Sequence, residues 1–307
     1  ENHHETQQNQ ESAEHTLPDI PLIWILPFVI LLLVIAVLPL FAPHWWEHNT
    51  HKAYISFPLG IITLIYFISI GGSINVVHTF IEFSQFIILL GSLFIISGGI
   101  VLKGDIKATT QVNTLFLAIG SLIASLVGTT GASMLLIRPI LKINASSRSQ
   151  VVHTVIFFIF LVSNIGGSLT PLGDPPLFLG YLRGVPFTWT LHLLPQWLFS
   201  VVTLLILYFV WDTILYKKDA SNQTNISTRG KISIEGKINF LFLIGVIISV
   251  AFSQAIGDAI NHAFGIDPHH LPVFLQALFH GGSPYRELIM IGLILLSLKS
   301  TNIQLRR

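Results

Sequence analysis

The sequence of 307 residues contains no cysteine, and charged side chains make up only 10% of it. Without cysteine the chain has no disulfide framework, no thiolate nucleophile and no metal site built on thiolates. Ordinary soluble domains carry roughly 25% charged residues, so the scarcity of charge excludes a soluble globular enzyme and a disordered chain. The formal net charge of +1 provides no field that attracts nucleic acid, and no nucleic-acid partner is expected.

Apolar residues account for 52% of the chain, and its mean hydropathy is +0.72. A membrane-spanning helix needs about 20 apolar residues, so the composition predicts an all-α polytopic membrane protein with about seven to eight membrane helices and lipid as its surroundings. The apolar stretches cover residues 20–41, 53–70, 83–102, 112–141, 151–182, 188–215, 238–256 and 288–298.

Residues 1–19 differ from the rest of the chain because they are polar throughout. They include five acidic side chains and no lysine or arginine. A segment with no apolar face to bury is expected to be disordered. We therefore interpret 1–19 as an acidic tail and 20–298 as the transmembrane domain.

Lysine and arginine collect on the cytoplasmic side of membrane proteins, which allows the chain to be oriented. With the tail placed in the periplasm of a bacterial inner membrane, thirteen of the 16 basic residues are cytoplasmic and only Arg183 and Arg286 are periplasmic. This asymmetry requires residues 111–141 to enter and leave the membrane on one side. It predicts a re-entrant helical hairpin over 111–141, a broken helix over 151–182 and a cytoplasmic loop over 216–237. The cytoplasmic set is Lys52, Lys103, Lys107, Lys142, Arg148, Lys217, Lys218, Arg229, Lys231, Lys237, Lys299, Arg306 and Arg307.

Two interruptions of helix at mid-membrane are typical of secondary transporters. Irregular backbone is tolerated there only where it lines a cavity, and the half-helix ends direct their partial charges at one point. Carbonyl and hydroxyl oxygens at such a point suit sodium, a hard cation. The proposed cation-binding and proton-binding residues are Thr129, Thr130, Ser133, Asn164, Thr170, Gly173 and Asp174.

Asp174 is the only acidic residue between Asp105 and Asp212. An ionised carboxylate at mid-membrane is costly unless it is paired or ligated, so Asp174 is expected to bind a cation, a proton, or each in turn. Two structural alternatives remain open at this point. The glycine-proline stretch around Asp174 is also compatible with a solvated loop, and Thr129 with a small residue at a helix crossing.

Arg138 lies near the inner end of its apolar run and has two interpretations. Its side chain either extends to lipid headgroups or acts as a counter-charge for an anion or for Asp174. An intramembrane aspartyl protease would need a second acid beside Asp174, and the sequence places Asp212 and Asp258 at span edges. We therefore expect no enzyme and no bound cofactor. His78, His153 and His192 lie near helix ends and are weaker candidates for a proton relay.

Three motifs resemble the ion transporter superfamily, and within it the NhaD-type sodium/proton antiporters and citrate transporter-like, ArsB-related proteins. They are GTTGASMLLIRP at 128–139, SNIGG at 163–167 and TPLGDPP at 170–176. The resemblance implies one half of an inverted-repeat transporter, in which Asn164 and Asp174 handle sodium and protons. The departures are a hairpin tip without acid or amide, and prolines after Asp174 in place of threonines.

The leading function predicted from the sequence is sodium/proton antiport, with sodium at Thr129, Thr130, Ser133, Asn164 and Asp174. The alternatives are sodium-coupled or proton-coupled transport of an organic anion such as citrate, and an inactive membrane fragment or scaffold. Members of the superfamily are longer, so residues 299–307 are expected to be a truncation point. The expected partner is then a missing C-terminal half or a second copy of the chain in a homodimer.

Overall fold

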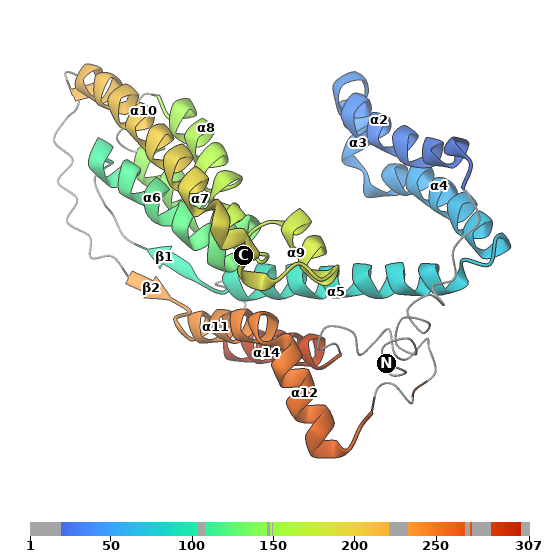
Figure 1. The fold of residues 1–307 in the computed structure, drawn as a ribbon. Coiled ribbons are helices and arrows are strands. Elements are labelled where there is room, and N and C mark those ends of the chain that lie inside the picture. Colours follow the sequence, from blue (N-terminus) through green and yellow to red (C-terminus); the bar gives the residue numbers. More distant parts are fainter. Residues whose placement is uncertain are drawn as a thin grey trace. The chain divides into compact units, whose positions relative to one another are not determined.

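The computed structural model describes residues 20–103, 108–145, 148, 150–220, 233–267, 271 and 284–301, and helices dominate this part of the chain (Figure 1). The predicted tail 1–19 and residues 302–307 of the predicted terminal segment lie outside it. In chain order the elements are η1 (Leu22–Ile25), α2 (Leu26–Phe41), α3 (Pro43–Glu47), α4 (Asn49–Ser69), α5 (Ser73–Ser97), β1 (Val101–Lys103), α6 (Thr110–Val127), α7 (Thr129–Ala145), α8 (Val152–Leu161), η2 (Ile165–Leu169), α9 (Pro175–Leu182), η3 (Phe187–Leu193), α10 (Leu194–Ala220), β2 (Ser233–Glu235), α11 (Ile238–Ala251), α12 (Ser253–Phe264) and α14 (Tyr285–Ser300).

The described residues contain six helical segments that are long and apolar enough to cross a membrane, or up to seven if a bent pair counts as one span. The six are Leu22–Phe41, Asn49–Ser69, Ser73–Ser97, Thr110–Val127, Val152–Leu169 and Phe187–Lys218. Helix α14 has 16 residues and is shorter than these. The prediction of an all-α polytopic membrane protein is confirmed.

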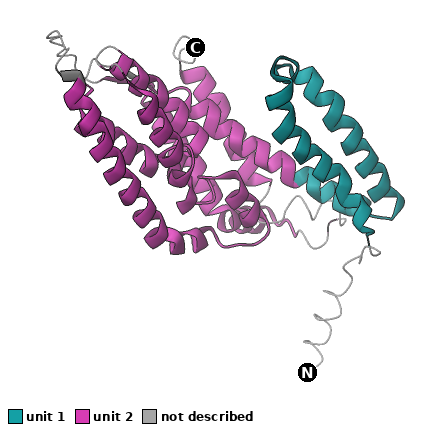
Figure 2. Ribbon diagram, turned by 90° about the horizontal axis from the view of Figure 1, so that it is seen from above, with its two compact units in different colours: residues 1–81 teal, residues 82–307 magenta. Residues whose placement is uncertain are grey.

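The chain forms two compact units, residues 1–81 and 82–307 (Figure 2). In the first unit α2 packs against α4, and Trp24 stacks on Tyr66 with 3.7 Å between ring centroids. Neither of these two helices fully buries a residue, so their apolar side chains stay at least partly exposed. Such an exposed apolar surface suits contact with lipid rather than with water.

Helices α6, α7, α8 and α10 build the core of the second unit around side chains such as Leu117, Phe158 and Tyr208, each at most 2% exposed. Gly120 on α6 allows the chain at the end of α8 to approach this helix closely. A Cβ atom at Gly120 would lie 2.7 Å from Val162, too close for any real side chain. Small residues at helix crossings are the usual way to bring membrane helices together.

Helices α6 and α7 form a hairpin over the predicted segment, and its re-entrant path through the membrane stays a prediction. Its turn is Gly128, whose φ of +81° is readily adopted only by glycine. At the open end the buried amides of Asn113 and Asn144 exchange two hydrogen bonds of 2.8 and 2.9 Å. The two helices therefore run back along each other and are fastened at both ends.

Three chain segments that the charge pattern assigns to the cytoplasmic side meet at one end of the second unit. Strands β1 and β2 pair antiparallel, with Val101 opposite Glu235. The Asn239 amide donates to the Gly99 carbonyl (3.0 Å) and to the Thr301 hydroxyl (2.9 Å). These bonds join the ends of α5 and α14 to the start of α11. Strand β2 and the last turn of α10 lie inside the predicted loop, and residues 221–232 of it are outside the described range.

The span predicted for residues 238–256 is interrupted by a bend that the sequence did not predict. The structure divides it into α11 and α12, which are bent by 77° at Phe252. The hydroxyl of Tyr181, on α9, donates to the Val250 carbonyl (2.8 Å) and lies 2.5 Å from the Ser253 Oγ. The bend leaves helix carbonyls without their usual amide donors, and the Tyr181 hydroxyl donates to one of them. Local hydropathy does not indicate a bend here, because the apolar run continues through it.

Candidate functional site

The predicted broken helix is present, and its residue types explain the break. Helix α8 ends at Leu161, a short 3-10 turn covers Ile165–Leu169, and α9 begins at Pro175. Glycine lowers the cost of irregular backbone, and Pro171 cannot donate the amide hydrogen that a continuing helix needs. A proline at the first position of α9 favours a new helix start there.

The tip of the hairpin docks on this break. The Thr129 amide, the first of α7, donates to the Gly173 carbonyl at 3.0 Å. The Ser125 hydroxyl donates to the Gly166 carbonyl, and the Thr170 hydroxyl donates to the Ser125 carbonyl. Backbone groups that the two interruptions leave unpaired thus satisfy one another.

Glycine is required where the two interruptions meet. A Cβ atom built on Gly173 would lie 1.8 Å from the Gly167 carbonyl oxygen. One built on Gly167 would lie 2.5 Å from both the Gly173 carbonyl oxygen and the Thr129 Cγ2. No side chain fits at such distances, so the contact depends on both glycines.

Of the residues predicted for the site, Thr129, Thr170 and Gly173 come together at this contact and are buried. The Ser133 Oγ lies 2.7 Å from the Ser163 Oγ, one turn further along α7. These polar groups hold the hairpin on the break, which leaves fewer of them free for an ion than the sequence predicted.

The side chains of the other predicted residues take no part in this contact. Thr130 and Asn164 are exposed, and their side chains form no hydrogen bond with the described part of the chain. Arg138 is exposed and lies nine residues beyond Thr129 on α7. Asp174 is partly exposed, and no described residue forms a hydrogen bond or ion pair with its carboxylate.

The two helix starts at the break differ in what they present to a ligand. At α9 the first two residues are prolines, and the next two amides donate to the Asp174 carbonyl at 3.0 and 3.3 Å. This start therefore provides a carboxylate but no free amide. At α7 the amides of Thr130 and Gly131 lie in the first turn, where no helix carbonyl precedes them. A helix start of that kind suits an anion, whereas the Asp174 carboxylate suits a cation.

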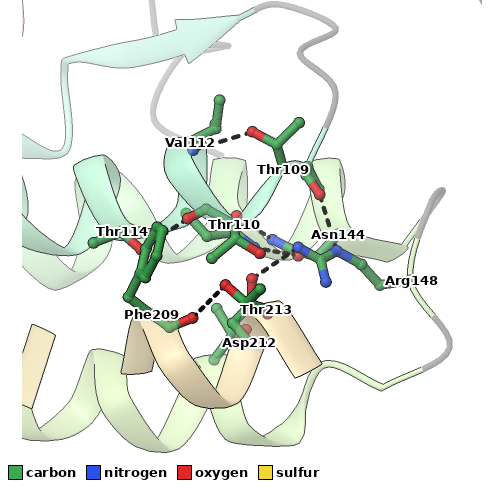
Figure 3. Close-up of polar contacts among 12 residues, drawn as sticks. Thr109, Thr110, Val112, Thr114, Asn144, Arg148, Phe209, Asp212 and Thr213 are labelled. Atoms are coloured by element: carbon green, nitrogen blue, oxygen red, sulfur yellow. Dashed lines mark hydrogen bonds and ion pairs between the residues drawn. The ribbon is translucent and has the colours of Figure 1, made fainter. Parts of the chain in front are cut away.

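A buried ion cluster lies at the opposite, open end of the hairpin (Figure 3). Arg148, just after α7, places its Nη2 2.9 Å from the Asp212 Oδ2 on α10, and both side chains are 1% exposed. The His153 Nε2 on α8 lies 2.7 Å from the other oxygen of Asp212. The Arg148 Nε also donates to the Ala108 carbonyl at 2.9 Å. One carboxylate thus ties the hairpin to two neighbouring helices.

The association of these three residues was not predicted from the sequence. There Arg148 falls in a segment expected to be cytoplasmic, Asp212 at a span edge, and His153 among three candidates for a proton relay. The available signal was Asp212 itself, because an acid within an apolar run of a membrane protein needs a charged partner. Nothing in the sequence identifies a partner 64 residues away. Among the described residues, no group of three or more histidine, aspartate or glutamate side chains is arranged to hold a metal ion.

Comparison with known proteins gives one family match, over residues 17–307, to a family described as "Putative citrate transport". The match includes both compact units, the hairpin and the broken helix. No curated protein and no solved structure matches the chain.

Substituting Gly173→Ala is expected to separate the hairpin tip from the break, because the new methyl group overlaps the Gly167 carbonyl. We expect a loss of unfolding free energy of about 1–3 kcal/mol, as for other overpacked interiors, measured by thermal unfolding in detergent. Gly180→Ala, where a Cβ has ordinary contacts, is the matched control. Equal stability of the two variants would contradict the role given to Gly173.

Substituting Asp212→Asn is expected to destabilise the second unit by about 3–5 kcal/mol, because it leaves the buried Arg148 charge without its partner. Chemical unfolding in detergent measures the effect. Asp258→Asn, which changes an exposed acid on α12, should have little effect. In the double variant Asp212→Asn/Arg148→Gln much of the stability should return, and a double variant no more stable than the single one would argue against the ion pair.

Proposed function

We propose a transport cycle for this chain, which belongs to the citrate-transport family matched by residues 17–307. In this cycle the protein is a secondary transporter that moves a citrate-like carboxylate across a membrane together with a coupling cation. The observation that carries the proposal is the contact between hairpin tip and helix break, from the Thr129 amide to the Gly173 carbonyl. Irregular backbone of this kind within a membrane protein is typical of substrate and ion sites in secondary transporters.

The start of α7 supports the anion in this proposal. The amides of Thr130 and Gly131 belong to a helix of 17 residues whose axis ends at the break. Their unpaired N–H groups and the helix dipole favour a carboxylate. The exposed side chain of Thr130 adds a hydroxyl group at the same helix start, and the Asn164 amide is a further exposed polar group at the break.

Asp174 supports the coupling cation. Its carboxylate is partly exposed and has no partner among the described residues. A carboxylate in that state inside a membrane gains from binding a proton or sodium. Neutralising it also makes the site more favourable for a substrate that is itself negatively charged, which is how one cation promotes the binding of one anion.

The membrane setting is part of the same proposal. Lysine and arginine dominate the segments that meet at the open end of the hairpin, which assigns this end to the cytoplasm and the N-terminus to the periplasm of a bacterial inner membrane. The hairpin would then enter from the cytoplasm and end at the break.

Sodium/proton antiport is the second candidate, and the prolines at the start of α9 favour it. Pro175 and Pro176 remove two amide donors beside Asp174, so this side of the break offers oxygen atoms alone. In that mechanism Asp174 releases its proton when sodium arrives, with Thr129, Thr130, Ser133 and Asn164 as the nearby oxygen-bearing side chains, and no organic anion is needed.

Citrate uptake into proteoliposomes that contain the purified chain tests the proposal. The wild type should accumulate labelled citrate when a sodium or proton gradient is applied, and Asp174→Asn should reduce gradient-driven uptake to background because the cation no longer has a carboxylate to bind. Asp258→Asn, an exposed acid outside the break, should transport like the wild type. Proton movement driven by sodium without citrate, lost in Asp174→Asn, would establish antiport instead.

A further inference from the structure

A second buried pair of opposite charges lies at the start of α14. Arg286 is 2% exposed and Glu287 is 6% exposed. The Nε and Nη2 of Arg286 donate to the Glu287 Oε1 at 2.7 and 2.5 Å. The sequence analysis placed Arg286 on the periplasmic side as an ordinary loop cation, whereas its guanidinium is enclosed by protein.

The geometry of this pair indicates that Glu287 is an imperfect partner for the Arg286 guanidinium and occupies a place that another carboxylate would fit better. Adjacent residues on a helix do not normally face each other, yet Arg286 reaches its immediate neighbour. Both donors converge on one oxygen, and the buried Glu287 Oε2 forms no hydrogen bond with the described part of the chain. A carboxylate that matched the guanidinium fork would use both oxygens in parallel. The pair therefore leaves a buried oxygen unsatisfied and the guanidinium incompletely matched.

The surroundings favour negative charge. Arg286 lies in the first turn of a helix of 16 residues, where the helix dipole adds positive potential to its own charge. Its guanidinium carbon is 5.7 Å from the ring centre of Phe178 and 5.9 Å from that of Tyr181, within the range of cation–π contacts. Glu287 is the only carboxylate to which the described structure pairs this guanidinium. If Glu287 were protonated, the site would carry a buried positive charge that needs an anion.

Arg286 is also connected to the broken helix. Phe178 and Tyr181 lie three residues apart on one face of α9, the helix that begins directly after Asp174. Tyr181 also holds the bend between α11 and α12 through its contact with Ser253. A charged pair that changed its state would therefore act directly on two interrupted helices.

We propose that Arg286 binds a carboxylate of the transported anion and that Glu287 competes with this anion for it. This inference rests on the proposed function. In the state that the structure describes, the Glu287 carboxylate is bonded to the Arg286 guanidinium. A proton that binds the Glu287 Oε2 removes the negative charge and weakens both hydrogen bonds, and the two N–H groups then turn to a substrate carboxylate. One proton thus accompanies one anion, without any covalent step.

The other described arginines suit this role less well. Arg138 is exposed on α7, nine residues beyond Thr129. Arg148, just after α7, is engaged with Asp212 at the open end of the hairpin. Arg183 forms a 3.1 Å ion pair with Glu82, but its side chain is 70% exposed. That exposed pair lies at the end of α9 and provides a matched control for Arg286 and Glu287.

Few other titratable groups lie near enough to replace Glu287 as the proton acceptor. Helix α11 carries none, and the described ones on the remaining elements that pack against α14 are limited to a small set. They are Tyr181 on α9, Glu82 on the part of α5 that belongs to the second unit, Asp258 and His262 on α12, and Tyr285 and Lys299 on α14 itself. Tyr285 donates its hydroxyl to the Asn261 Oδ1 at 2.7 Å.

Calorimetric citrate binding to the purified full chain, repeated over a range of pH, tests the proposal. Citrate itself titrates, but equally for every variant, so differences between variants belong to the protein. Glu287→Gln imitates the protonated side chain at the same size. Relative to this variant, the wild type should lose affinity as pH rises, by up to about tenfold per pH unit for one linked proton. Glu287→Gln should bind more tightly than the wild type at alkaline pH.

Arg286→Gln is made in the Glu287→Gln background, so that no buried charge is left unpaired and the protein folds. This double variant should bind citrate about tenfold more weakly or worse than Glu287→Gln, since a charge-assisted hydrogen bond is lost. Arg183→Gln/Glu82→Gln should behave as the wild type does.

The outcomes separate this inference from the proposed function. A wild-type pH profile in Glu287→Gln, or unchanged citrate affinity in the double variant, overturns the inference while citrate binding itself stands. A wild type that binds no citrate at any pH overturns the proposed function and this inference with it. The predicted profiles, with an unaffected control pair, support both.

Discussion

Backbone groups that leave a helix within a membrane must find partners inside the protein, and this requirement determines the arrangement of the second unit. The hairpin tip has an amide without a helix carbonyl, and the broken helix has a carbonyl without a helix amide. The bond from Thr129 to Gly173 satisfies both, and the contact of Ser125 with Gly166 repeats the solution one turn earlier. Each interruption is tolerated because the other lies against it, and Gly167 provides the space for this approach.

The remaining polar contacts hold the frame around this junction. The open end of the hairpin is fixed by the paired amides of Asn113 and Asn144 and by the Arg148–Asp212 ion pair, all buried away from solvent. The junction itself depends on a few hydrogen bonds between backbone and hydroxyl groups. A frame that is rigid at one end and lightly bonded at the other allows the tip to separate from the break, which is the movement that alternating access through this site would need.

Features set by local residue types were predictable from the sequence, and features set by distant partners were not. Gly128 and the run from Gly166 to Pro176 identify the turn and the break because glycine and proline act on their own backbone. The bend at Phe252 was missed because hydropathy continues through it, and its hydroxyl partner, Tyr181, lies about seventy residues earlier. For the same reason the burial of Asp212 and Arg286 could not be inferred, since the charges that pair with them are chosen by the fold. The predicted residues Thr130, Asn164 and Asp174 are present at the break but are not drawn into its hydrogen bonds.

The depth of the hairpin tip in the membrane tests the central claim most directly. Because the chain has no cysteine, single substitutions such as Thr130→Cys, Asn164→Cys and Gln111→Cys each accept one spin label without background. Depth measured by relaxation agents in bilayers should place the labels at 130 and 164 together near the membrane centre, and the label at 111 at the cytoplasmic surface. A label at 130 in the headgroups opposite the label at 111 would contradict the account, because the hairpin would then cross the membrane completely rather than end at the break.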